Sequence, residues 1–236
     1  APLFKKWIRH CYRQGDVVIT PTEYSRELLM KYDLHREIYA LTNGVDTEFF
    51  HKTEQAGGQF RVLFHIPVDK KVVISAGHLI RRKGILDFLE TARRMPDVLF
   101  LWFGGGNHAL IPEEIKRAVA EKPENVIFAG FVPSIILRDA YSGADAFAFF
   151  SYEETEGIVV LEALSCEIPV IIRDIPVYDE WLEDGVQVRK ATDPDSYEQA
   201  LREILSGERQ EEVLRRTREG RALAEEHSMK ATGERL

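Results

Sequence analysis

An acidic loop and an isolated glutamate stand where an apolar strand pattern passes into an apolar helix pattern. Residues 153–163 read Glu-Glu-Thr-Glu-Gly-Ile-Val-Val-Leu-Glu-Ala, so Glu154 and Glu162 are eight residues apart. Glu162 has apolar neighbours, among which an unpaired carboxylate is costly, and ribose hydroxyl groups would satisfy it. A phosphate could bind the free N–H groups at the helix start, which belong to Gly157, Ile158 and Val159. Composition alone leaves open the alternative of a solvated acidic run and an ordinary helical glutamate.

A basic loop, residues 77–84, precedes another helix pattern. It reads Gly-His-Leu-Ile-Arg-Arg-Lys-Gly, which places Arg82 and Lys83 at a helix N-terminus. Cations there are electrostatically unfavourable unless something negative binds, so we interpret the loop as a phosphate site rather than a solvated basic loop. The Phe-Gly-Gly-Gly turn at residues 103–106 follows the next apolar run. Its glycines permit either close approach of a ligand or a tight turn.

The elements that must position these loops alternate between strand and helix patterns from residue 62 onward. Apolar runs of strand length occur at 72–75, 98–103, 126–128, 144–150, 169–172 and 185–188. Helix patterns lie between and after them, at 85–94, 112–120, 135–141, 158–166, 177–182, 195–205 and 209–226. This alternation predicts an α/β fold, a Rossmann-like doubly wound parallel sheet. Ligands of such sheets bind at the carboxyl ends of the strands, where both loops are expected.

The first 52 residues have a different organisation. A basic amphipathic helix over residues 4–13 precedes a strand at 16–20, a helix that Thr20 caps and that ends near Lys31, and a strand at 38–41. Residues 53–59 are polar, contain glycine and offer little to bury. We therefore predict two domains, residues 1–52 and residues 53–236. Because the chain begins at Ala1 inside an amphipathic segment, we also expect a fragment of a longer protein.

Composition and charge exclude several classes of protein. A chain with 44% hydrophobic and 30% charged residues is globular rather than disordered. The net charge of −8 argues against a nucleic-acid partner, which needs a concentrated basic surface. No apolar stretch is long enough for a membrane helix, and no signal-peptide pattern is present. Two cysteines without metal-site or Cys-x-x-Cys spacing fit a reducing compartment, so we expect a cytoplasmic protein.

The motifs, taken in order, resemble those of the group 1, or family 4, glycosyltransferases, whose two-domain fold is called GT-B. The family's Gly-Arg-Leu-x-x-x-Lys-Gly loop, Phe-Gly-x-Gly turn, Gly-Phe-x-x loop and Glu-x7-Glu segment followed by Pro-Val correspond here to residues 77–84, 103–106, 130–133, 154–162 and 169–170. Residues 17–50 resemble the end of the family's first domain. Residues 153–163 and 173–178 are most similar to bacterial enzymes that glycosylate diacylglycerol-based glycolipids.

The resemblance implies roles for individual residues. Lys83 and Glu154 are the expected catalytic residues, which neutralise the donor diphosphate and bind hydroxyls of the transferred sugar. Glu162 would bind the ribose. The remaining donor-binding residues would be Gly77, His78, Arg82, Gly104, Phe131, Val132, Gly157, Ile158 and Val159, with Phe131 and Val132 holding the base. Two positions depart from the family pattern: His78 replaces Arg, and Glu156 replaces Phe and is expected to add charge beside the donor.

The function that this resemblance implies is hexose transfer, with retention, from UDP-glucose or UDP-galactose to an acceptor that is a glycolipid or another sugar. The acceptor would bind through the first domain, most of which we expect to be missing, so the isolated chain is expected to be inactive. No cofactor or metal is expected, because Asp193-Pro194-Asp195 reads as a turn and helix N-cap. The alternatives are a nucleotide-sugar epimerase of the same fold and a non-catalytic nucleotide-binding module.

The first helix has two interpretations. Lys5, Lys6, Arg9 and Arg13 accompany Phe4, Trp7, Ile8 and Tyr12, and no acidic residue precedes Asp16. The pattern favours a surface helix that packs its aromatic face and leaves its cations in water. The alternative is a peripheral contact with an anionic membrane at the cytoplasmic side.

Overall fold

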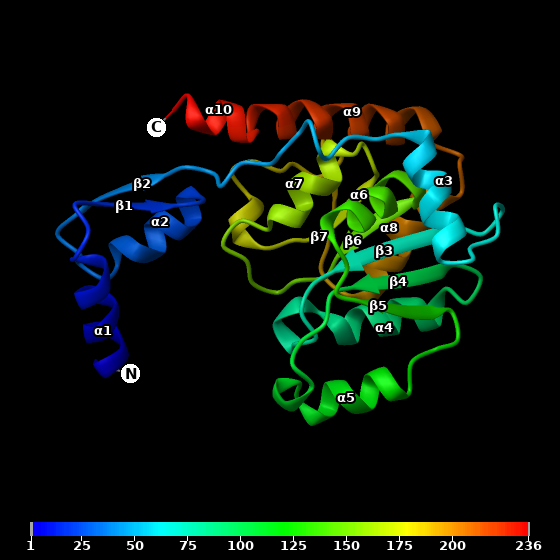
Figure 1. Cartoon of the computed structure of the whole chain (residues 1–236), viewed down its shortest axis with the longest axis horizontal. Coiled ribbons are helices and arrows are strands. Elements are labelled where there is room, and N and C mark those ends of the chain that lie inside the picture. The colour runs from blue at the N-terminus through cyan, green and yellow to red at the C-terminus, as the bar shows by residue number, and fades with distance from the viewer. Residues whose placement is uncertain (1, 236) are drawn as a thin grey trace.

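The computed structural model describes the backbone of residues 2–235 and the side chains of residues 3–107 and 109–235. Two units are visible in Figure 1, joined by an extended segment. The smaller unit contains α1 (Pro2–Tyr12), β1 (Val17–Thr20), α2 (Glu23–Met30) and β2 (Glu37–Ala40). Its two strands pair in parallel, with Val17 opposite Glu37. We call residues 41–53, which lead from β2 into the larger unit, the connecting segment.

The larger unit is built on a six-stranded parallel sheet. Its strands are β3 (Val72–Ala76), β4 (Leu99–Phe103), β5 (Val126–Gly130), β6 (Ala146–Phe149), β7 (Val170–Arg173) and β8 (Arg189–Ala191). The spatial order is β5-β4-β3-β6-β7-β8, so the direction of winding reverses between β3 and β6. The loops after these two strands therefore diverge at a topological switch point, which is where open α/β sheets bind ligands.

Helices cover both faces of this sheet, as Figure 1 shows. One face carries α4 (Ile85–Arg94), α5 (Glu113–Ala120) and α8 (Pro194–Leu205), whose apolar side chains surround Phe100 and Trp102. The other carries α3 (Glu54–Leu63), α6 (Ser134–Gly143), α7 (Ile158–Ser165) and α9 (Gln210–Glu226). Every residue of β3, β6 and β7 is buried, because both faces of these strands are covered.

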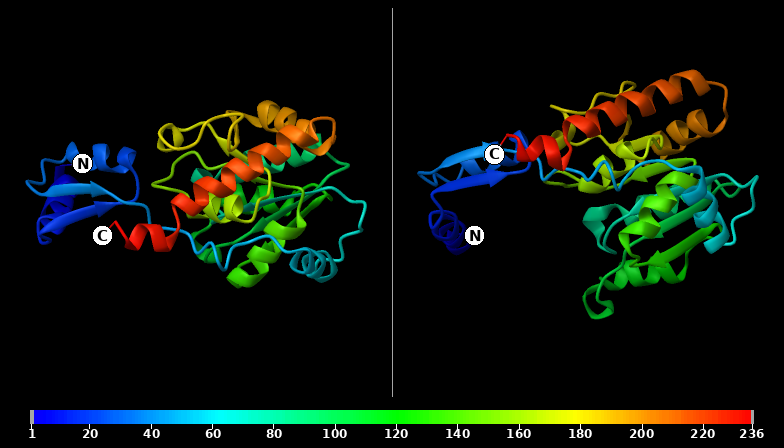
Figure 2. Two further views of the ribbon diagram at one scale, coloured as in Figure 1. Left: turned by 90° about the horizontal axis from the view of Figure 1, so that it is seen from above. Right: turned by 45° about the horizontal axis from the view of Figure 1, so that its top comes forward.

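The C-terminal helices return toward the smaller unit, which both views in Figure 2 show. A short α10 (Met229–Gly233) follows α9. The connecting segment is fixed to this end of the chain, because the Val45 N–H donates to the His227 carbonyl at 3.0 Å and the Met229 N–H donates to the Val45 carbonyl at 3.0 Å. Gly44 has a φ of +76°, and a Cβ there would lie 2.8 Å from the Cα of Met229, so only glycine fits.

The fold class predicted from the sequence is confirmed, and most predicted elements appear within one or two residues of their bounds. The predicted strand at 185–188 is wrong, because Gly185 has a φ of +79° and its N–H closes a turn on the Val188 carbonyl. Strand β8 begins at Arg189, directly after the predicted range. Residues 177–182 form no α-helix, only the 3₁₀ turn Pro176–Tyr178 and further turns. α10 has no counterpart in the prediction.

Two further predictions are wrong in the first 60 residues. The N-cap of α2 is Thr22 rather than Thr20, because its hydroxyl accepts from the Ser25 N–H at 3.2 Å. Residues 53–59 do bury surface, since they form the cap and first turns of α3, where a Cβ on Gly57 would meet the Ser142 carbonyl of α6 at 2.7 Å. Glycine here permits close helix contact rather than marking a linker. The division of the chain at residues 52 and 53 stays a prediction.

α1 packs in a way that the amphipathic pattern does not predict. Its arginines are engaged: Arg9 donates to the Tyr32 carbonyl at 2.6 Å, and Arg13 donates to the Asp33 carbonyl at 2.8 Å. Phe4 and Trp7 stack on one another and are 57% and 60% exposed. The expectation of a buried aromatic face with all four cations in water is therefore wrong for the described residues. No helix in the described part of the chain is long and apolar enough to cross a membrane.

Candidate functional site

An ion pair between Lys83 and Glu154 lies at the switch point. Lys83 ends the 3₁₀ turn Arg81–Lys83 after β3, and Glu154 lies in the acidic loop, residues 151–157, after β6. The two side chains are only 14% and 8% exposed. Ser151 donates to the same Glu154 oxygen at 2.6 Å, and Arg82 Nη1 lies 3.8 Å from the second oxygen. The structure thus brings together the two predicted catalytic residues, 71 positions apart.

Glycines shape the frame around this pair. Gly84 has a φ of +73°, and a Cβ there would lie 2.0 Å from the Phe150 carbonyl oxygen, so the basic and acidic loops touch through a site that only glycine can occupy. Gly77 packs against the aliphatic part of Lys83, and its carbonyl would lie 2.3 Å from a Cβ on Gly104. Trp102 Nε1 donates to that Gly77 carbonyl at 2.9 Å. The predicted Gly77 and Gly104 are therefore adjacent.

Glu162 points into a largely buried environment on α7. Burial raises the pKa of its carboxyl to about 7, against which a hydrogen bond from Tyr141 acts to lower it. The Tyr141 hydroxyl lies 3.3 Å from Glu162 Oε2 and also 3.3 Å from the Val159 carbonyl. One hydroxyl proton cannot serve both acceptors, so Glu162 is only weakly satisfied within the protein and could accept hydrogen bonds from a ligand.

The start of α7 is open to an anion. Gly157 is its N-cap with a φ of +81°, and the next N–H groups, of Ile158 and Val159, have no acceptor within the helix. Beneath Gly157 stands Tyr178, whose buried hydroxyl has no hydrogen-bond partner among the described residues. A Cβ on Gly157 would lie 2.5 Å from that hydroxyl oxygen. Glycine at position 157 therefore leaves room for the Tyr178 side chain, a contact that sequence reasoning missed.

The remaining predicted residues line the edge of this region. Phe131, directly after β5, is 91% exposed, and Val132 packs partly against the core. His78 is exposed, and its Nδ1 lies 3.1 Å from the Gly105 carbonyl. It is therefore not a packed core histidine. The loops after β3, β4 and β5 are joined by hydrogen bonds, among them Gly104 N–H to the Gly130 carbonyl at 2.7 Å.

Glu156 does not face this region, contrary to the expectation that it adds charge beside a ligand. Its side chain is buried, and its carboxylate accepts hydrogen bonds from the Thr42 hydroxyl and from Asn43 Nδ2, the latter at 2.6 Å. Three glutamates in one short run, Glu153, Glu154 and Glu156, thus point to three different surroundings. The spacing of acidic residues gave no signal for this.

A network behind the acidic loop also escaped prediction. Arg173, 4% exposed at the end of β7, forms an ion pair with Asp87 of α4 and donates to the Phe150 carbonyl at 3.0 Å. Its guanidinium lies 3.8 Å from the ring centroid of Tyr152, whose hydroxyl donates to Asp87 at 2.6 Å. These contacts fix the beginning of the acidic loop on α4. The only sequence signal is a cation directly after the apolar run at residues 169–172.

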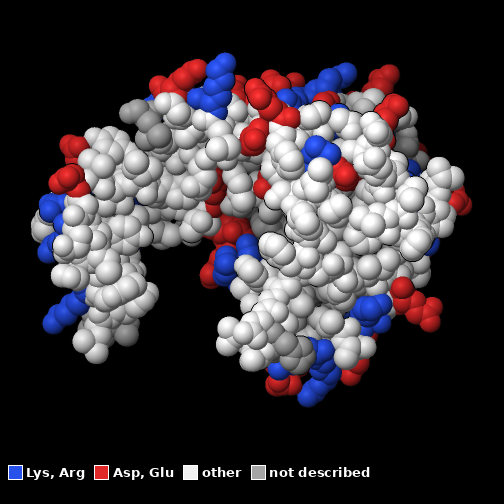
Figure 3. All heavy atoms as spheres, in the orientation of Figure 1, with Lys and Arg blue, Asp and Glu red and all other residues white. Residues whose placement is uncertain are grey.

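A cleft of about 530 Å³ lies between the two units. The smaller unit contributes Tyr24 and Leu28 of α2, and the larger unit contributes a wall that includes Arg82, Glu154 and the Ile175–Val177 turn. Figure 3 shows the hollow between the units, with acidic and basic side chains gathered at its inner end. Of the two residues of the ion pair, Glu154 lines this cleft.

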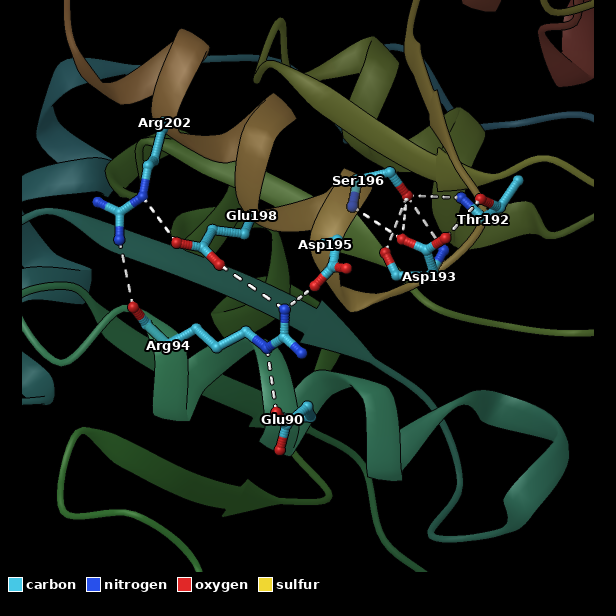
Figure 4. Close-up of polar contacts among 8 residues, drawn as sticks. All are labelled: Glu90, Arg94, Thr192, Asp193, Asp195, Ser196, Glu198 and Arg202. Carbon is cyan, nitrogen blue, oxygen red and sulfur yellow. Dashed lines mark hydrogen bonds and ion pairs between the residues drawn. The ribbon is translucent and has the colours of Figure 1, made fainter.

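Asp193 and Asp195, whose spacing invites a metal-site interpretation, are both engaged elsewhere. Asp193 is the N-cap of α8 and accepts from the Ser196 N–H at 2.9 Å, while Asp195 pairs with Arg94 (Figure 4). Hydrogen bonds from Ser196 lower the pKa of the Asp193 carboxyl. The predicted turn and N-cap are confirmed. In the described part of the chain no three His, Cys, Asp or Glu side chains form a cluster that could hold a metal ion.

Comparison of the amino-acid sequence with known proteins identifies the family of this chain. The model for "Glycosyl transferases group 1" matches residues 60–221. The processive diacylglycerol alpha-glucosyltransferase of Acholeplasma laidlawii is 37% identical over all of this chain and 70% of its own length. The alpha-galactosylglucosyldiacylglycerol synthase of Streptococcus pneumoniae is 30% identical over 77% of this chain.

Solved structures agree on the fold. Anabaena HepE, in complex with UDP and glucose, superposes with a TM-score of 0.84 at 18% identity over 98% of this chain and 64% of its own. The chain thus spans less than two thirds of that structure and only 50% of the pneumococcal synthase. A family model that covers most of the chain, and the first relative's identity over its full length, show that this protein belongs to the group 1 glycosyltransferases.

Proposed function

We propose that this chain supplies the nucleotide-sugar-binding half of a retaining glycosyltransferase. The donor is UDP-glucose or UDP-galactose, and the acceptor is a glycolipid or another sugar. The observation that carries the proposal is the Lys83–Glu154 ion pair at the switch point of the sheet, where Glu154 lines the cleft between the units. A cation and a carboxylate that neutralise each other can exchange partners for a diphosphate and a sugar rich in hydroxyl groups.

Each residue of the site has a part in this proposal. Lys83 and the free N–H groups of α7 bind the diphosphate, since a helix start favours anions. Glu154 accepts hydrogen bonds from the sugar, and Glu162 accepts them from the ribose. The exposed ring of Phe131 offers an aromatic face on which a base can stack.

Charge stabilisation is the main catalytic effect in this mechanism. As the bond from the anomeric carbon to the diphosphate breaks, negative charge grows on the leaving oxygen, and Lys83 with the α7 N–H groups stabilises it. The acceptor hydroxyl forms its bond to the anomeric carbon on the face that the leaving group vacates, which retains the configuration, and its proton passes to the departing diphosphate oxygen. Glu154 accepts hydrogen bonds from the sugar hydroxyls in this mechanism, and no protein carboxylate acts as nucleophile.

The names of relatives support the choice of ligands. Two curated relatives are named for diacylglycerol glycolipids, and the HepE structure holds UDP and glucose. The test is calorimetric titration and thermal unfolding of this chain with UDP, UDP-glucose, UDP-galactose and other nucleoside diphosphates. A specific ligand at 100 times its dissociation constant stabilises the folded chain by about 2.7 kcal/mol. Absence of any shift with all of them would refute the proposal.

Product analysis separates the proposal from its alternatives. The full-length enzyme, given a UDP-hexose and diacylglycerol vesicles, should form a glycolipid whose anomeric proton shows retention by NMR. An epimerase would interconvert UDP-hexoses without an acceptor, and a non-catalytic module would bind UDP and form no product. Either result would replace the transferase proposal.

We place the enzyme at the cytoplasmic face of a membrane, in peripheral contact through α1. The face that would meet lipid carries Leu3, Phe4 and Trp7, which are 81%, 57% and 60% exposed, beside the exposed Lys5 and Lys6. Apolar side chains together with lysines are the composition that binds at an anionic interface. The contact matters because a lipid acceptor must reach the cleft from a membrane.

A further inference from the structure

The Glu156 carboxylate joins the acidic loop to the connecting segment. It receives hydrogen bonds from the Thr42 hydroxyl, from Asn43 Nδ2 at 2.6 Å and from the Asn43 N–H at 3.2 Å. Glu156 is 3% exposed and Thr42 is 8% exposed, so water does not compete for these bonds. Residues more than 110 positions apart are thereby held in one geometry.

This arrangement does more than fill space. Glu156 forms no ion pair among the described residues, and the hydrogen bonds that its carboxylate accepts from them come from neutral donors alone. Because Thr42 and Asn43 supply all of these hydrogen bonds, loss of either residue's contact would leave the buried carboxylate unsatisfied. An unsatisfied buried charge is far more costly than a lost apolar contact. An apolar side chain could slide against the connecting segment, whereas hydrogen bonds fix both distance and direction.

The neighbouring residues face other parts of the molecule. The Thr155 carbonyl accepts from the Thr22 hydroxyl at 2.8 Å and from the Ser25 hydroxyl at 3.1 Å, both at the start of α2 in the smaller unit. Glu154 pairs with Lys83 in the larger unit. Three consecutive residues therefore contact the ligand-facing lysine, the smaller unit and the connecting segment. A displacement of any one of them must move the others.

We propose that Glu156 is a positioning residue that couples the ligand-facing conformation of the acidic loop to the arrangement of the two units. When the smaller unit is in the observed orientation, Thr42 and Asn43 hold Glu156, and Glu154 is presented to Lys83. By linkage, a ligand that fixes the acidic loop also stabilises this orientation. The inference rests on the proposed function only for the choice of UDP as the ligand.

The experiment measures orientation and affinity separately. A spin label on the exposed Cys11 of the smaller unit and a second on Glu121→Cys, at the exposed end of α5, report the distance between the units by pulsed electron resonance. Cys166 should stay unlabelled because it is buried, and burial raises the pKa of its thiol to about 12. UDP affinity is measured by calorimetry on the same chains without labels.

The variants are Glu156→Gln, Thr42→Val and the conservative Thr42→Ser, with Glu208→Gln as a control. Glu208 undergoes the same chemical change, but it is exposed and lies between α8 and α9, outside the acidic loop and the cleft. We expect Glu156→Gln and Thr42→Val to broaden the distance distribution and to weaken UDP binding by roughly fivefold or more. Thr42→Ser and Glu208→Gln should behave as the parent chain does. Thr42→Val leaves the sequence of the acidic loop unchanged, so it tests the coupling even if Glu156→Gln does not fold.

Two results would overturn the coupling: a distance distribution that Glu156→Gln and Thr42→Val leave unchanged, or a broadened distribution with UDP affinity within twofold of the parent. Failure of the parent chain to bind UDP would count against the proposed function instead. The ligand-free distance distributions would still decide in that case whether Glu156 fixes the orientation of the units.

Discussion

Lys83 is balanced by Glu154 in the ligand-free chain, and a diphosphate would compete with Glu154 for it. We expect Lys83→Ala to weaken UDP binding about 10- to 100-fold, since a hydrogen bond to a charged group contributes about 1.5 to 3 kcal/mol. Uridine, which has no phosphate, should lose less than about threefold by the same reasoning. Calorimetry with both ligands makes the comparison. Equal losses for UDP and uridine would show that Lys83 does not meet the phosphates.

Glu162 makes the stability of the folded chain depend on pH. Its folded pKa is raised to about 7 from 4.5 by burial, so the protonated carboxyl is the form that folding favours. The contribution of the protonated Glu162 carboxyl to the free energy of unfolding is complete below the unfolded pKa of about 4.5, and it is lost as the pH rises through 7. The size of this change is on the order of 3 kcal/mol.

Glu162→Gln should remove that dependence. Relative to the parent chain, the variant should gain stability between pH 5 and pH 8, because the amide does not ionise. Urea unfolding at both pH values measures the gain, and Glu153→Gln serves as the exposed control. The same free-energy difference between parent and Glu162→Gln at pH 5 and pH 8 would contradict a raised pKa at Glu162.

Among the elements, the 3₁₀ turn that carries Lys83 depends on the glycine after it. Gly84→Ala must place a Cβ against the Phe150 carbonyl and keep a left-handed φ, so we expect a loss of more than about 2 kcal/mol. Gly207 has a similar φ of +76°, but no atom lies within 4 Å of its Cβ position. Gly207→Ala therefore incurs the backbone strain alone, about 1 to 2 kcal/mol. Chemical denaturation of both variants isolates the steric contact, and equal losses would show that the two loops do not touch.

The contacts of α1 change which of its cations we expect to bind a membrane. Because Arg9 and Arg13 bind carbonyls at the end of α2, we expect Lys5 and Lys6 to supply the attraction to anionic lipid, each about 1 kcal/mol. Changing both to Gln should reduce co-sedimentation of the full-length protein with anionic vesicles roughly 10- to 30-fold. The control changes the exposed Lys52 and Lys230 to Gln, which alters net charge equally. Matching losses in both pairs would remove α1 as the lipid contact.

For the whole molecule, we propose that Lys83 and the helix N–H groups take the place that a divalent cation has in other enzymes. If these groups suffice for the diphosphate, UDP affinity should stay within about twofold after EDTA treatment and after addition of Mg²⁺, since the anion site is built from protein donors. Calorimetry in the two buffers is the measurement. A tenfold gain with Mg²⁺ would show that a metal ion shares the diphosphate.

The amino-acid sequence determined the order and kind of most elements and the two loops of the site. Buried parallel strands and amphipathic helices have distinct periodicities, and the glycines and charges of the site stand at fixed places in the chain, after β3 and β6. Parallel winding brings the ends of such strands together. The convergence of the loops that carry Lys83 and Glu154 was therefore foreseeable from their positions after two apolar runs, whereas the ion pair between the two side chains was not.

Only the tertiary structure decided where the individual glutamates point and which face of α1 is used. Glu153, Glu154 and Glu156 lie within four residues, and a loop has no fixed periodicity from which their directions could follow. Glu156 is buried because Thr42 and Asn43 approach it from a distant part of the chain. Likewise, Arg9 and Arg13 face the protein because the turn after α2 presents the carbonyls of Tyr32 and Asp33 to them. Such contacts depend on segments that local patterns do not relate, so the sequence could not specify them by itself.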